Sequence, residues 1–344
     1  MGHVQALRRM GKRDTAPQGY AAEAVYHRPT GRDDEGTGAR VGRRWYGRDS
    51  GLTARMTLTL FGLGLIYVVF IAALIAAGVG AVAVLVIAAA FALVQILFGD
   101  RIALASMRAH VTEPHEAPEL HAMVERLCQL SDLPKPRVAI ADTELPNAFA
   151  AGHSRKTATV CVTTGLMQRL EPRELEGVVA HELAHIANKD VIVMTVAGFL
   201  ATVAGLLVRF GVYSGMMGRG RKDNGAAVFL VVVLVSIVVY VLSFLLLRAL
   251  SRYREFAADR GAAIMTGAPA QLASALARIS GTMDRIPTQD LRAAEGMNAF
   301  FIIPAVARGF SLSSLVSTHP PAERRIERLM AMQAQLDADP GAQL

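Results

Sequence analysis

The stretch of sequence that decides the fold is residues 171–190, EPRELEGVVAHELAHIANKD. Pro172 suits the first turn of a helix, Glu174 lies where the helix dipole favours a negative charge, and apolar residues recur after them at helical spacing. These features predict a helix over the whole stretch. On that helix His181 and His185 are four residues apart, so their side chains share one face.

Two histidines at this spacing, with Glu182 beside them, form a pattern that can hold a metal ion. Both imidazoles can bind one zinc ion, and Glu182 is then placed to take a proton from the attacking water. The competing interpretation is a solvated amphipathic helix that happens to carry two histidines. The neighbouring residues are mostly apolar, however, and an unpaired polar group among them would be unfavourable. We therefore predict one Zn²⁺ per chain, bound by His181 and His185.

A zinc site of this kind takes a third protein ligand and leaves the fourth position to water. Glu255 is the best candidate, because it closely follows one long apolar run while the two histidines closely precede another. If those runs form an antiparallel pair of helices, all three side chains emerge on the same side. Asp259, one helical turn after Glu255, is placed to hydrogen-bond a ligating imidazole. The alternative for both carboxylates is a solvated helix face that they share with neighbouring arginines.

Long apolar runs predict membrane-spanning helices. Residues 56–99 contain no charged residue, and a single helix of that length would far exceed a hydrocarbon core of about 30 Å. This run therefore divides at Gly78-Val79-Gly80. The expected spans are 56–77, 79–98, 191–208 and 226–247, which form two hairpins over 56–98 and 191–247. The alternative is a set of buried core helices, or for residues 228–241 a pair of buried strands.

The composition agrees with a membrane protein and excludes several other classes. Of the 344 residues, 52% are hydrophobic and 19% are charged, where about a quarter charged is usual. The two cysteines, Cys128 and Cys161, are too few for a disulfide framework or a four-cysteine zinc site, and we expect both to be buried. Aromatic residues make up only 6%, and no nucleic-acid-binding module is recognisable. We therefore expect no nucleic-acid partner despite the net charge of +7.

Most of that charge lies in residues 1–55, which hold 11 Lys and Arg residues against 6 Asp and Glu residues. The segment lacks apolar periodicity, so we predict a disordered basic tail that lies in the cytoplasm by the positive-inside rule. Two hairpins then return residues 99–190 and 248–344, the two parts of the catalytic domain, to the same side. The basic loop 209–225 would lie outside, against that rule. Either the tail dominates, or the last two spans do not cross fully.

Taken together, these motifs resemble the HtpX-type membrane zinc metalloproteases, which are related to the CAAX prenyl proteases. The resemblance covers about residues 56–335, and the tail is longer and more basic than it leads us to expect. It rests in order on the first hydrophobic pair, PNAFAAG at 146–152, HELAH at 181–185, Glu255 with Asp259, and STHPP at 317–321 followed by Arg325. It implies a gluzincin-like domain with four transmembrane helices, facing the cytoplasm from a bacterial inner membrane. It also implies zinc-dependent endoproteolysis of damaged or misassembled membrane proteins.

The resemblance also gives a role to Asn147, Ala148 and Phe149. These residues lie between two segments, 137–142 and 157–164, whose β-branched and alternating residues predict strands. In relatives this stretch borders the cleft, and an extended substrate adds to an edge strand there by β-augmentation. The alternative is a plain hairpin with Phe149 in the core.

Two further residues near the C-terminus receive candidate roles. His319 lies in a turn before a predicted helix over 322–335, and a histidine beside prolines is ordinarily only a turn residue. The resemblance implies a position near the zinc, where His319 stabilises the oxyanion or acts as an extra ligand. Arg325 is a second candidate oxyanion or structural partner, or pairs with Glu323 or Glu327 on the surface.

We therefore expect a four-span zinc endopeptidase that acts on polypeptides, with membrane proteins and the lipid bilayer as its partners. A prenyl-peptide protease is the nearest rival, and the four predicted spans argue against it because those relatives carry more. A non-catalytic membrane scaffold or transporter with a structural metal is the rival from another class. Transport usually leaves ionisable groups inside the spans, and the four predicted spans are uncharged.

Overall fold

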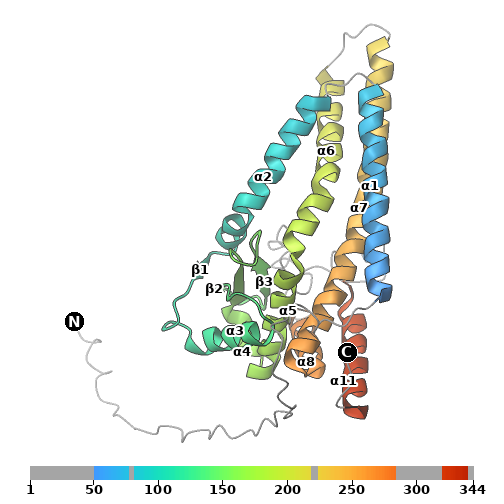
Figure 1. Ribbon diagram of the computed structural model, residues 1–344. Coiled ribbons are helices and arrows are strands. Elements are labelled where there is room, and N and C mark those ends of the chain that lie inside the picture. The colour runs from blue at the N-terminus through green and yellow to red at the C-terminus, as the bar shows by residue number, and fades with distance from the viewer. Residues whose placement is uncertain (1–49, 77–80, 218–223, 284–319, 340–344) are drawn as a thin grey trace, which may run out of the picture. The chain divides into compact units, whose positions relative to one another are not determined.

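The computed structural model describes residues 50–76, 81–217, 224–283 and 320–339. These residues form mostly helices and one small sheet, as predicted (Figure 1). The helices are α1 (Ser50–Ala76), α2 (Ala81–Ser106), α3 (Pro118–Leu130), α4 (Thr164–Arg169), α5 (Pro172–Asn188), α6 (Asp190–Met217), α7 (Asn224–Thr266), α8 (Pro269–Met283) and α11 (Ala322–Ala338). The basic tail was expected over 1–55, but α1 already begins at Ser50, and residues 1–49 lie outside the described residues.

Four short strands form a mixed sheet in the order β1-β2-β4-β3. They are β1 (Ala109–Val111), β2 (Arg137–Ala141), β3 (Ala148–Ala151) and β4 (Thr159–Thr163). The parallel pair β2 and β4 corresponds to the two strands predicted from residue alternation, whereas β1 has only three residues and too little pattern to be recognised. Strand β3 pairs antiparallel with β4 and forms one edge of the sheet.

Both faces of this sheet are buried, because alternate residues of each strand point to opposite sides. Val160 and the strand residues that point to the same side of the sheet belong to the core formed with α3 and α5. Cys161 and Phe149 point to the other side, where they pack with Ala103 and Met107 at the end of α2. All five residues of β4 are consequently buried.

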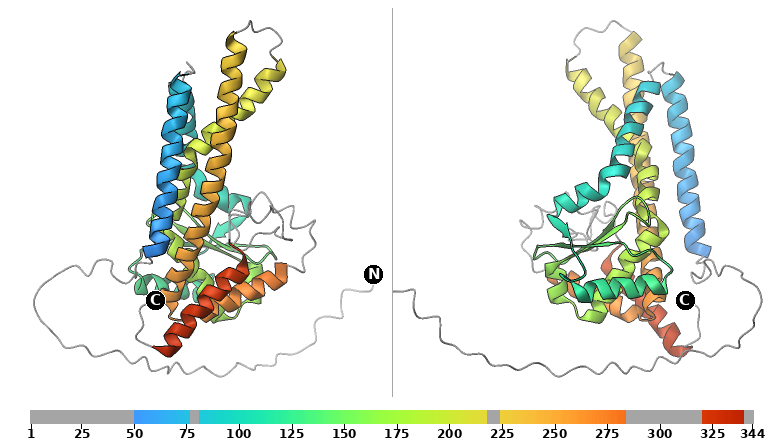
Figure 2. Two further views of the ribbon diagram at one scale, coloured as in Figure 1. Left: turned by 90° about the vertical axis from the view of Figure 1, so that its right-hand side faces the viewer. Right: turned by 60° about the vertical axis from the view of Figure 1, so that its left-hand side comes forward.

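The four long helices α1, α2, α6 and α7 correspond to the four predicted spans. Helix α1 packs against α7, α7 against α6, and α6 against α2 (Figure 2). Small residues allow close approach within this bundle, as at Gly205 of α6, where an added Cβ would lie 3.3 Å from the Tyr240 ring of α7. Tyr67 of α1 donates a hydrogen bond to the carbonyl oxygen of Ala197 in α6.

Two of the described helices are long and apolar enough to cross a membrane by length and composition. They cover 50–75, with a mean hydropathy of 2.6, and 230–266, with a mean hydropathy of 3.1. Only 22% and 17% of their apolar windows are buried, whereas the core helix of a soluble protein would be mostly buried. Crossing of a membrane by any of the four long helices remains a prediction.

Helix α5 is the central element of the part outside the bundle and contacts α3, α7, α8 and strand β3. It starts with a capping box in which the side chains of Glu171 and Glu174 satisfy each other's backbone N–H groups. The same Glu174 carboxylate accepts hydrogen bonds from Ser274 Oγ at 2.5 Å and Arg278 Nε at 2.9 Å, which tie α5 to α8. Gly177 allows the close approach of the two helices, since an added Cβ would lie 3.0 Å from the backbone nitrogen of Leu272.

Candidate metal centre

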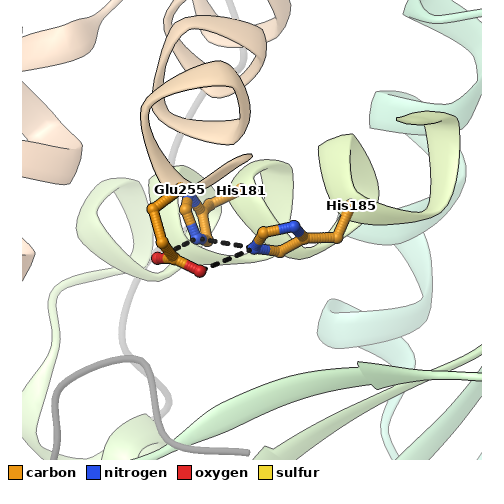
Figure 3. Close-up of side chains that lie close together, drawn as sticks. All are labelled: His181, His185 and Glu255. Atoms are coloured by element: carbon orange, nitrogen blue, oxygen red, sulfur yellow. Dashed lines mark hydrogen bonds and ion pairs between the residues drawn. The ribbon is translucent and has the colours of Figure 1, made fainter. Parts of the chain in front are cut away.

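The three predicted ligands converge on one point (Figure 3). The Nε2 atoms of His181 and His185 are 3.1 Å apart. Glu255 presents its two carboxylate oxygens to them, Oε2 at 3.6 Å from His181 Nε2 and Oε1 at 3.5 Å from His185 Nε2. A tetrahedral zinc ion with bonds of about 2.0–2.1 Å separates its ligand atoms by about 3.3–3.4 Å. The donor set of two imidazoles and one carboxylate therefore fits this ion in both chemistry and spacing.

The helices explain why these side chains meet. The two histidines are one turn apart on α5, and Glu255 lies on α7, which packs directly against α5. Helix α7 has 43 residues in all and does not end with its apolar run but continues to Thr266. This continuation carries Glu255 alongside the histidines, as expected for an antiparallel pair of helices.

Asp259 contacts the first histidine in the predicted manner. Its Oδ1 lies 3.0 Å from His181 Nδ1, and both side chains are almost fully buried. With the proton on Nδ1, His181 donates to this carboxylate and keeps the lone pair of Nε2 for a metal ion.

A second carboxylate, which is not among the predicted site residues, contacts the other histidine. Asp190 Oδ2 lies 2.5 Å from His185 Nδ1, and the same carboxylate forms an ion pair with Arg254. The prediction of one helix over 171–190 was wrong at its end, because the chain breaks at Lys189 with φ = 58° and a new helix begins at Asp190. Neither glycine nor proline marks this break in the sequence.

Arg325 reaches the site from α11, and only 1% of it is exposed. The alternative prediction, that Arg325 pairs with a glutamate on the surface, is therefore wrong. Its Nε and Nη2 lie 2.9 and 2.6 Å from the two carboxylate oxygens of Asp259. Its Nη1 lies 3.2 Å from Glu255 Oε2. These are the contacts of a structural partner, while a role at the oxyanion remains a prediction.

Glu182 is buried beside the predicted ligands, with an exposed fraction of 4%. Burial raises the pKa of this carboxyl, and the charges of His181 and His185 act in the opposite direction. Glu182 is thus buried on α5 together with His181, which precedes it in the sequence.

Comparison with known proteins identifies the family. Residues 114–333 match the peptidase family M48. A Protease HtpX homolog from Moorella thermoacetica is 54% identical over 296 residues, which cover 86% of this chain and 99% of that protein. Protease HtpX homolog 2 from Methanosarcina mazei is 51% identical over 294 residues, with the same two shares. The chain belongs to peptidase family M48.

Membership of M48 confirms the resemblance and, with it, the expectation of a membrane metalloprotease. The part that matches M48 includes α5, the end of α7 and most of α11, and so all three predicted ligands. A crystal structure of S. mikatae Ste24p aligns with a TM-score of 0.47 and 17% identity, over 81% of this chain and 67% of that one.

The stretch predicted to contact substrate lies at the sheet edge of this M48 chain. Ala148 and Phe149 begin edge strand β3, and Asn147 is held just before it by hydrogen bonds between its backbone and Thr163. Phe149 belongs to the core on the sheet face opposite α5, as the alternative interpretation expected. If the stretch binds substrate, its backbone does so rather than the Phe149 ring.

A cavity opens beside the end of β3 and reaches one of the predicted ligands. Its lining is Ala150, Ala151, Gly152, His153, Ser154, Arg155, Ala158, His185, Ile186, Lys189, Asp190, Val191 and Ile192. The edge strand and the histidine helix thus line the same hollow in this M48 fold, and His185 is the predicted ligand that it reaches.

His319 and the two cysteines complete the comparison with the sequence predictions. His319 lies outside the described residues. The cysteines are buried and unpaired, as expected, and burial together with the charge of Glu182 raises the pKa of the Cys161 thiol to about 12.

Proposed function

We propose that this M48 member is a zinc-dependent endopeptidase whose zinc ion is held by His181, His185 and Glu255. The observation that carries the proposal is the meeting of two Nε2 atoms and one carboxylate at separations of 3.1–3.6 Å. When bound, zinc acidifies the attacking water and polarises the peptide carbonyl.

In this proposal Glu182 is the general base. It takes a proton from the attacking water and then donates that proton to the leaving amine. Its position between the two histidines in sequence, and its burial together with His181, support this role. Arg325 holds Glu255 and Asp259 in place, and His319 assists at the oxyanion as the family resemblance implies.

We further propose that the substrate binds in extended form along β3. An edge strand offers backbone N–H and C=O groups, and pairing with them grips the backbone of a substrate rather than particular side chains. Such binding accepts many sequences, which suits the removal of misfolded or damaged proteins.

The location of the site favours membrane proteins as substrates. Glu255 lies eight residues after Leu247, the predicted end of the span on the same helix, and thus about 12 Å beyond it at about 1.5 Å per residue. A segment that leaves the bilayer next to this enzyme reaches the metal centre within a few residues. We infer a four-span arrangement, supported by the packing of α2 and α6 alongside α1 and α7. The inner membrane and a centre on the cytoplasmic side follow from the family resemblance and the basic N-terminal segment.

The test is a comparison of two single variants with the wild type. The protein is purified in detergent with a chelator, which suppresses self-cleavage, and zinc is then restored. Glu182→Gln should bind one zinc ion and cleave an unfolded membrane protein at no measurable rate. Glu176→Gln is the matched control, because it removes a carboxylate from the same helix. The Glu176 carboxylate pairs with Arg126 at 2.8 Å and not with a residue of the site. This variant should cleave like the wild type.

Two results would overturn parts of this proposal. Cleavage by Glu182→Gln at the wild-type rate would exclude Glu182 as the base. Cleavage of a farnesylated peptide, with the unfolded membrane protein left intact, would favour the prenyl-peptide alternative.

A further inference from the structure

Each predicted histidine ligand has its own carboxylate, and each carboxylate has its own buried arginine. On one side His181 contacts Asp259, which contacts Arg325. On the other side His185 Nδ1 contacts Asp190 Oδ2 at 2.5 Å, and Asp190 forms an ion pair with Arg254. The first set corresponds to the sequence prediction for Asp259, whereas Asp190 and Arg254 of the second set have no role in the function proposed above.

The second set is built by the break between α5 and α6. If α5 continued without a break, a residue five positions after His185 would lie about 140° around the helix from it. Instead Lys189 adopts a left-handed conformation with φ = 58°, and its backbone N–H closes α5 on the carbonyl oxygens of His185 and Ile186. The chain then restarts as α6 at Asp190, whose carboxylate folds back onto the imidazole.

Arg254 completes the set from the opposite helix. It lies on α7 immediately before the third predicted ligand, Glu255, and only 4% of it is exposed. Asp190 is buried to a similar degree, with 7% exposed. A carboxylate this far from water is stable as an anion only when positive charge or hydrogen-bond donors surround it, and Arg254 and the His185 N–H supply both.

We propose that Asp190 is a positioning residue for the metal ligand His185 and that Arg254 holds Asp190 in place. The carboxylate keeps the proton on Nδ1, turns Nε2 toward the metal and makes this nitrogen a stronger donor. Because Asp190 is the first residue of α6 and Arg254 lies on α7, metal affinity then depends on how the start of α6 docks against α7. This inference rests on the proposed function in one respect, namely that zinc is bound by His181, His185 and Glu255.

The test measures the zinc dissociation constant by competition with a chelator. All proteins carry Glu182→Gln, so that none cleaves itself during purification. Asp190→Ala should weaken zinc binding about 10- to 100-fold, the usual effect of losing a hydrogen-bond partner of a metal-ligating histidine. Arg254→Gln should weaken it by a smaller factor. The double variant should bind no more weakly than Asp190→Ala, because Arg254 acts only through Asp190.

Two further proteins make the result specific. Asp190→Asn keeps the size of the side chain and one acceptor oxygen, so it should lose less affinity than Asp190→Ala, and it carries the test if the alanine variant does not fold. Arg252→Gln is the matched control, since Arg252 is a partly exposed arginine two residues before Arg254 on α7. It should bind zinc like the parent protein.

Thermal unfolding of the zinc-free proteins separates a positioning role from a merely structural one. If Asp190→Ala unfolds at a lower temperature but binds zinc with the parent's dissociation constant, the positioning role is wrong. If Arg254→Gln leaves the dissociation constant unchanged while Asp190→Ala raises it, the role of Arg254 is wrong. If the parent protein itself binds no zinc, the proposed function fails, and this inference fails with it.

Discussion

Replacing Arg325 with methionine removes the positive charge that lies between two buried carboxylates. The guanidinium bonds both oxygens of Asp259 at 2.6 and 2.9 Å and lies 3.2 Å from Glu255. Methionine keeps much of the side-chain volume but donates no hydrogen bond. Both carboxylates, which are 2% and 5% exposed, then lose their main counter-charge in the zinc-free protein.

The size of the effect follows from that burial. Removing one partner of a buried ion pair destabilises a protein by about 3–5 kcal/mol, because the remaining charge is left without compensation. At about 2–4 °C per kcal/mol for a domain of this size, the zinc-free protein should unfold about 6–20 °C below the wild type. Zinc should restore part of this loss, because the ion supplies positive charge beside the same carboxylates.

The assay is thermal unfolding in detergent, with chelator and with saturating zinc, on wild type, Arg325→Met and Arg324→Met. Arg324 is the matched control, since it is the preceding residue of α11 and is exposed. An unfolding temperature of zinc-free Arg325→Met within about 2 °C of the control would refute the structural role. Wild-type stability combined with a loss of about 10²- to 10³-fold in kcat would instead identify Arg325 as an oxyanion donor.

Three other substitutions test separate parts of the structure. Glu255→Ala should abolish stoichiometric zinc binding, measured by metal analysis after gel filtration, and full occupancy would require a different third ligand. Phe149→Ala should reduce the free energy of unfolding by about 3–5 kcal/mol and leave zinc affinity unchanged, since the ring fills the core on the sheet face opposite α5. Burial raises the pKa of Glu174, but hydrogen bonds from Ser274 and Arg278 outweigh this and lower it. The stability that Glu174 contributes is therefore present above its unfolded pKa of about 4.3 and is lost as the pH falls through the lower folded pKa. Glu174→Ala should therefore reduce the free energy of unfolding by about 1–3 kcal/mol at pH 7 and by less at pH 3.

The parts of the site that follow local helix geometry could be predicted from the sequence. His181 and His185 share a face of α5 because the helix has 3.6 residues per turn, and the same rule relates Glu255 to Asp259 on α7. The meeting of the two helices was predictable as well, because each set of ligands closely flanks an apolar run.

The contacts that depend on a chain break, or on a distant segment that no apolar run brings close, could not be predicted. Asp190 reaches His185 only because Lys189 is left-handed, and lysine gives no sign of that conformation. Arg325 meets Asp259 across 66 residues of sequence, and its own neighbours offered acidic partners that were equally plausible. Strand β1 was missed because three residues carry too little alternation to distinguish a strand from a loop.

Helix α7 carries a candidate membrane span and the predicted ligand Glu255 in one continuous helix. Its 43 residues contain no proline, and at about 1.5 Å per residue it is a rod of about 65 Å. A tilt of the apolar part would therefore move Glu255, which lies on the same helix, and a shift of a few tenths of an ångström already matters to a zinc bond. The contacts of Asp190 with His185 and Arg254 tie the start of α6 to both α5 and α7, the two helices that carry the predicted ligands.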